Sequence, residues 1–199
     1  MEKKKGVSKK IIIISIVIVL LVVGIVIGAF IIHNNKPVNV VEETLEGGKL
    51  SLTYSDEQNL FTIENAIPTS DVVGKAYDSA DLFFDFTVKS TLEEANTLDY
   101  DIILVKDESV STALESNIKV YLEKEKNGSF ISVGNPIVFE KNYNDVELGN
   151  VLMKLYSFSR NSSGSDNYRL RMWLSDSAVF SPEQAQNFGV KIAVVGRAN

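Results

Sequence analysis

The chain has 199 residues, a formal net charge of −6, 45% hydrophobic residues and 23% charged residues, which is the composition of a folded chain. It contains no cysteine, which excludes disulfides, thiol nucleophiles, iron–sulfur clusters and zinc sites with cysteine ligands. Its only histidine is His33, so multi-histidine metal centres and HExxH metallopeptidases are excluded as well.

The N-terminal part predicts a membrane anchor. Residues 1–10 contain five lysines, and an uninterrupted apolar run follows from Ile11 to Ile32. A helix of that length spans roughly 33 Å, close to the roughly 30 Å hydrocarbon core of a bilayer. The positive-inside rule places the lysines in the cytoplasm. We therefore expect a cytoplasmic tail at 1–10, one transmembrane signal-anchor helix at 11–32, and an extracellular C-terminal domain on a single-pass protein of the cell membrane.

Signal cleavage is the alternative for this segment. A cleavable signal peptide has an apolar region of roughly 7–15 residues followed by a site with small side chains. The apolar run of this chain is longer, and residues 30–34 (FIIHN) offer no pair of small residues. Its length favours the uncleaved anchor.

The next segment, 33–48, is expected to act as a juxtamembrane linker. Within it, residues 38–41 (VNVV) are β-prone, so this stretch is either a stalk or an edge strand. From Lys36 onward the chain carries 25 acidic and 15 basic residues, a net charge of 15 − 25 = −10. We expect no nucleic-acid partner, because phosphate binding needs a concentrated positive patch.

Residues 49–199 predict an all-β domain. Short runs alternate apolar and polar residues, which is typical of strands with one buried face. The Asn127-Gly128 pair indicates a hairpin turn between two such runs. One short helix is expected at 181–186, with Ser181 as its N-cap. The predicted strands are 49–54, 60–64, 82–89, 100–106, 118–123, 137–140, 151–158, 168–174 and 190–195. Many short strands with frequent turns favour an antiparallel β-sandwich.

Four segments of this domain carry a family resemblance: 61–68 (FTIENAIP), 84–89 (FDFTVK), 101–104 (DIIL) and 168–176 (YRLRMWLSD). Their order and spacing resemble the TasA/camelysin-type surface proteins of Gram-positive bacteria, over residues 60–195. The resemblance implies a jelly-roll-like sandwich outside the cell and, for some members, fibre assembly in a biofilm matrix. Members typically carry a short cleavable signal peptide, unlike this chain. Some are classed as peptidases, but no metallopeptidase motif is present here, so no catalytic residue is transferred.

The sequence indicates no catalytic residues and no cofactor. His33 lies beside the predicted membrane helix, so no Ser-His pair forms within the domain. Paired carboxylates such as Asp99/Asp101 suit glycoside hydrolysis in principle, but exposed loop acids explain them better. Asp145 and Asp166 lie in segments with oxygen ligands for calcium, without a calcium-loop spacing. Ordinary turn formation is the better interpretation of those segments.

Arg169, Arg171 and Trp173 are the candidate ligand-binding residues. They alternate with aliphatic residues, so they share one face of a strand. That face could bind an anionic cell-wall polymer, with the arginines pairing to it and the indole stacking on it. Cross-strand pairing with acids, or stacking of arginine on a ring, is the competing interpretation and the one we favour.

We therefore expect a membrane-anchored surface protein acting as a non-catalytic binding or structural module. One alternative is a secreted biofilm-matrix or fibre subunit released by signal cleavage, and another is a carboxylate-based hydrolase. Self-association by strand addition, using residues 37–48, is a further expectation.

Overall fold

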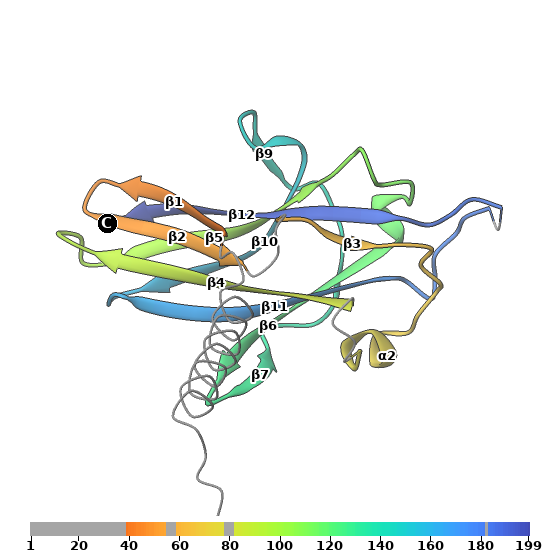
Figure 1. Cartoon of the computed structure of the whole chain (residues 1–199), viewed down its shortest axis with the longest axis horizontal. Helices are drawn as coiled ribbons and strands as arrows, with labels where there is room; N and C mark the ends of the chain where they lie inside the picture. Colours follow the sequence, from red (N-terminus) through yellow and green to blue (C-terminus); the bar gives the residue numbers. More distant parts are fainter. Residues whose placement is uncertain (1–38, 55–58, 78–81, 182) are drawn as a thin grey trace, which may run out of the picture. The chain divides into compact units, whose positions relative to one another are not determined.

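The computed structural model describes residues 39–54, 59–77, 82–181 and 183–199 (Figure 1), with side chains from residue 42 onward. The predicted transmembrane helix at 11–32 lies outside these residues. No helix within the described ranges is long and apolar enough to cross a membrane. The described residues form two antiparallel β-sheets that enclose one hydrophobic core, which confirms the predicted all-β sandwich.

Sheet A has the strand order β1-β2-β4-β11-β6-β7. The short strand β8 pairs with a different part of β6 from β7. Each pair in it is antiparallel. The strands of sheet A are β1 (Asn39–Leu45), β2 (Gly48–Tyr54), β4 (Phe83–Leu92), β6 (Ile118–Lys126), β7 (Ser129–Ser132), β8 (Ile137–Val138) and β11 (Gly164–Leu174).

Sheet B has the strand order β3-β12-β5-β10-β9, again with antiparallel pairs. The strands of sheet B are β3 (Phe61–Ile63), β5 (Leu98–Lys106), β9 (Tyr143–Asp145), β10 (Gly149–Arg160) and β12 (Phe188–Ala198). The connections include helix α2 (Asp71–Lys75) and the 3-10 helix η2 (Glu115–Asn117).

The core lies between the sheets, and its residues are the apolar members of the alternating runs. Leu170 of sheet A and Ile102 of sheet B are both fully buried in it. Because successive side chains of a strand point to opposite faces, the intervening residues lie on the outer faces of the sandwich. Two outer faces are thereby available for function, one on each sheet.

A polar contact crosses the core near one end. Tyr100 of β5 and Tyr168 of β11 join their hydroxyl groups at 2.7 Å, and Tyr100 also donates to Asp166 at 3.0 Å. Burial raises the pKa of both phenols. Burial also raises the pKa of Asp166, but Lys124 and other donors outweigh it, so the net shift is downward. The phenols therefore stay protonated and the carboxylate charged, which links the two sheets by hydrogen bonds.

Two local expectations are confirmed by backbone geometry. Asn127 and Gly128 have φ values of 54° and 79°, the conformation of a tight hairpin turn between β6 and β7. Residues 39–45 form edge strand β1, which pairs in full with β2 of the same chain. Of the two interpretations of the β-prone stretch, the edge strand is therefore the one observed, and the sheet begins within the segment 33–48 that we assigned to a linker.

The helix expected at 181–186 is not formed by the residues described there, and that prediction was wrong. The carbonyl groups of this segment bond to other loops instead, since Ala66 donates to the carbonyl of Gln186 and Thr112 to that of Ala185. Tertiary hydrogen bonds have replaced those a helix would make. Among the described residues, helix α2 begins after Ser70, whose hydroxyl accepts a hydrogen bond from the Val73 amide.

Candidate functional site

The predicted face of Arg169, Arg171 and Trp173 lies on the outer side of sheet A, as the alternation indicated. Trp173 is nevertheless buried, with 2% of its surface exposed. Its ring packs edge-on against Tyr121, and helix α2 covers it so closely that a Cβ atom at Gly74 would lie 2.3 Å from the indole Cδ2. The indole therefore has no open face on which a ligand could stack.

The two arginines of this face already have protein partners. Arg169 donates two hydrogen bonds of 2.7 Å to Asp85, and its guanidinium lies 3.6 Å from the ring centre of Phe83. Arg171 is buried, donates to Glu123 at 2.8 Å and also donates to the carbonyl of Tyr77. Both cross-strand pairing with acids and stacking on rings are present. These contacts favour the structural interpretation of the face.

The two weak calcium candidates are also engaged. Asp145 accepts hydrogen bonds from the amides of Glu147 and Leu148, which is a local turn. Asp166 forms ion pairs with Lys124 at 3.1 Å and Arg160 at 2.7 Å. Over the described ranges, no three His, Cys, Asp or Glu side chains converge in a way that could hold a metal ion.

The outer side of sheet B carries a hollow that the sequence did not indicate. It has a volume of about 660 Å³, within the roughly 300–1,000 Å³ of typical small-molecule sites. We call it the outer-face groove. Its lining side chains on this face are Asp99 and Asp101 of β5, Lys154, Ser157 and Ser159 of β10, Val195 and Arg197 of β12, and Tyr143 of β9.

Strand register builds the floor of the outer-face groove from two cross-strand rows. Asp101 lies between Val195 and Ser157, and Asp99 lies between Arg197 and Ser159. Neighbouring strands are roughly 4.8 Å apart, and residues two apart on one strand are roughly 6.6 Å apart. The short serine and valine side chains leave the hollow above the sheet.

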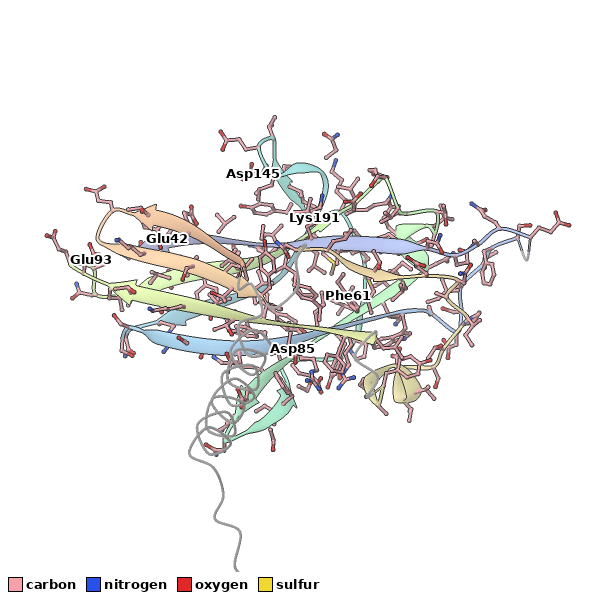
Figure 2. All side chains as sticks on the ribbon, viewed as in Figure 1. Glu42, Phe61, Asp85, Glu93, Asp145 and Lys191 are labelled. Atoms are coloured by element: carbon pink, nitrogen blue, oxygen red, sulfur yellow. The ribbon has the colours of Figure 1, made fainter. Side chains whose placement is uncertain are left out.

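The β9 hairpin forms one wall of this groove. It stands out from sheet B in Figure 1, and it brings Tyr143 to the groove's lining. Beneath the hairpin, Ile103 and Leu152 are fully buried although they lie on the outer face. Asp145 of this hairpin and Lys191, both labelled in Figure 2, line a second hollow, which also reaches β2 of sheet A.

The polar groups of the groove are partly satisfied within the protein. Asp101 accepts a hydrogen bond of 2.5 Å from the Ser157 hydroxyl and one of 3.5 Å from the Lys154 ammonium group. Asp99 accepts one of 2.8 Å from the side-chain amide of Asn199, at one of its two oxygens. In the part of the chain that the structure describes, the Arg197 guanidinium has no carboxylate within ion-pair distance.

The groove brings two carboxyl groups together with hydrogen-bond donors. A glycosidase places its two carboxyl groups on either side of the bond that it cleaves. Here Asp99 and Asp101 lie side by side on one face of one strand, and Asp101 is held by two donors. The groove can therefore offer acceptors and donors to a ligand, without a pair of acids placed across it.

The groove was missed because its residues are unremarkable within each strand. Asp99/Asp101 were expected to be exposed loop acids, but both lie in strand β5 and Asp101 is buried, so that expectation was wrong. Ser157/Ser159 read as ordinary exposed positions. Only the register of β10, β5 and β12 brings them together. The one available signal was the repeat of the same residue type at alternate positions of one strand, as in Asp99/Asp101 and Ser157/Ser159.

No protein-family model matches this chain, and no curated protein sequence matches it.

Proposed function

We propose that this chain is a membrane-anchored cell-surface protein whose β-sandwich acts as a non-catalytic binding module, with the outer-face groove as its binding site. The groove is the observation that carries the proposal, because it is an open hollow lined by hydrogen-bonding groups. The location rests on the sequence, namely the apolar run 11–32 and the lysines that precede it. The TasA/camelysin resemblance, a jelly-roll-like strand arrangement and a Gram-positive source remain part of the proposal.

A cysteine-free chain allows the location to be tested with single cysteines. Ser159 is exposed in the groove, and Ser8 lies in the basic tail. In intact cells, a membrane-impermeant maleimide should label Ser159→Cys and leave Ser8→Cys unlabelled until the cells are permeabilised. Labelling of Ser8→Cys alone in intact cells would reverse the orientation and overturn the location.

The same substitution tests the groove as a binding site. Ser165 on sheet A is the matched control, because it is also an exposed strand serine on an outer face. Isolated cell walls should retain the purified chain when a bulky maleimide is attached to Ser165→Cys, and should release it when the adduct is on Ser159→Cys. Equal retention of the two adducts would remove the groove from the proposal.

A secreted fibre or matrix subunit is the second candidate, favoured by strand β1. This strand has seven residues and forms an edge of sheet A, so it could accept a strand from a neighbour. Acids such as Glu42, labelled in Figure 2, place charge on that edge and oppose such pairing. The intact mass of the native protein distinguishes an uncleaved anchor from a released subunit. Light scattering at high concentration, with and without residues 37–48, tests the strand exchange.

A further inference from the structure

We infer that the ligand of the outer-face groove is a hydroxyl-rich saccharide chain, an inference that rests on the proposed binding function. Its basis is the row Arg197–Asp99–Ser159, which places donor and acceptor groups next to each other on the floor of the groove. Three other hollows of the described residues lack this combination of both kinds of charge with unbonded hydroxyl groups.

Several groups in the groove retain free hydrogen-bonding capacity. Within the described residues, the hydroxyl groups of Ser159 and Tyr143 and the guanidinium of Arg197 make no side-chain hydrogen bond, and Asp99 has one free carboxylate oxygen. A sugar hydroxyl is both a donor and an acceptor, so it can bond to a carboxylate with one side and to an arginine or serine with the other. The row Arg197–Asp99–Ser159 offers this sequence of partners across about 10 Å of sheet.

The balance of charge narrows the ligand class. Two cations, Lys154 and Arg197, are matched by two carboxylates, Asp99 and Asp101. A polyanion would place its charge against the two aspartates, and a polycation would place its charge against the lysine and the arginine, so each would meet repulsion in the same groove. A neutral polyhydroxylated chain meets neither cost.

The wall and the floor of the site fit a sugar unit of such a chain. The groove lies along a sheet surface, bounded on one side by the β9 hairpin. Tyr143 contributes an amphipathic ring to that wall, and such a ring packs against the apolar face of a sugar while its hydroxyl remains available. A saccharide can therefore lie along the sheet, with its hydroxyl groups on the two rows.

The test is calorimetric titration of the full chain, held in a detergent without sugar headgroups. The probes are hexasaccharides of glucose, mannose and N-acetylglucosamine, with polyphosphate and polylysine as charged comparisons. We expect at least one hexasaccharide to bind, and neither charged polymer to do so. Arg197→Ala and Ser159→Ala should each weaken that binding, Arg197→Ala by tenfold or more, because it removes the charged donors.

Two substitutions on sheet A control for loss of exposed polar groups in general. Lys89→Ala and Ser165→Ala change exposed strand residues that lie directly opposite each other, and they should leave saccharide binding unchanged. Binding of no hexasaccharide, or equal effects of groove and control substitutions, would overturn the inference. If a charged polymer binds instead and Arg197→Ala abolishes it, the saccharide is wrong while the groove remains a binding site. Unchanged circular dichroism of each variant ensures that lost binding reflects the groove.

Discussion

Truncation of Trp173 to alanine separates the two interpretations of its face most directly. As an exposed ligand platform, its loss would change the free energy of unfolding by less than about 0.5 kcal/mol. The buried position, the edge-on contact with Tyr121 and the close cover by Gly74 of α2 predict a structural loss instead.

The expected size of this loss follows from the surroundings of the ring. Truncation of a buried tryptophan costs about 3–5 kcal/mol. Trp173 lies beneath a single five-residue helix on the outer face of sheet A, so α2 can settle into part of the space left behind. We therefore expect the lower end, about 3 kcal/mol, which is a large part of the roughly 5–15 kcal/mol that stabilises most domains.

Urea unfolding of residues 36–199, followed by far-UV circular dichroism, measures the effect, since the variant has no tryptophan for fluorescence. With a urea slope of about 1–3 kcal/mol per molar, the midpoint should fall by about 1–3 M with no change in slope. Trp173→Phe is the matched control. The Nε1 atom of Trp173 has no hydrogen-bond partner among the described residues, so phenylalanine removes no such bond and should cost about 1 kcal/mol.

Gly74→Ala tests the same contact between α2 and Trp173 by a change in the helix. Its new Cβ atom would collide with the indole, and overpacking of this kind costs about 1–3 kcal/mol. In the double variant with Trp173→Ala the collision is gone. The double variant should therefore lose less free energy of unfolding than the sum of the two single losses. A Trp173→Ala midpoint within about 0.2 M of wild type, which is roughly the effect of an ordinary surface substitution, would refute the packing argument.

Three further predictions concern other parts of the sandwich. Asp107 has a pKa lowered to about 2 by hydrogen bonds from Ser109 and by Lys191. Its contribution of about 1 kcal/mol to the free energy of unfolding should therefore be complete above a pH of about 4 and be lost as the pH falls toward about 2. Acid titration of the unfolding midpoint measures this contribution, which should be absent from Asp107→Asn at every pH. Tyr100→Phe removes the hydroxyl that joins the two sheets and should lower the free energy of unfolding by about 1–3 kcal/mol in urea; no change would mean that the buried contact is replaced by water. Gly128→Ala meets no atom within 4 Å, yet its φ of 79° should cost about 1 kcal/mol, and a neutral result would indicate that the hairpin turn relaxes.

Local patterns in the sequence were sufficient for much of the fold. Alternation of apolar and polar residues in 82–89 and 168–174 predicted β4 and β11, because the two faces of a strand in a sandwich meet different environments. The Asn127-Gly128 turn was predictable for a local reason, since few other pairs adopt positive φ at both positions. The short strands β7 and β9 carried too few residues to show a pattern.

Tertiary structure decided the cover of each sheet face and the position of the groove, because both depend on which strands become neighbours. The alternation placed Arg169, Arg171 and Trp173 on one face, but only packing showed that α2 and acidic partners occupy that face. The short helix expected at 181–186 gave way to hydrogen bonds with distant loops. The outer-face groove exists only through the register of three strands. Asp99 and Asp101 of β5 lie between residues of β10, about 58 positions later in the chain, and residues of β12, about 96 positions later. Side-chain periodicity is a local property that the sequence itself determines, whereas register and cover are set by the free energy of the whole packed sandwich.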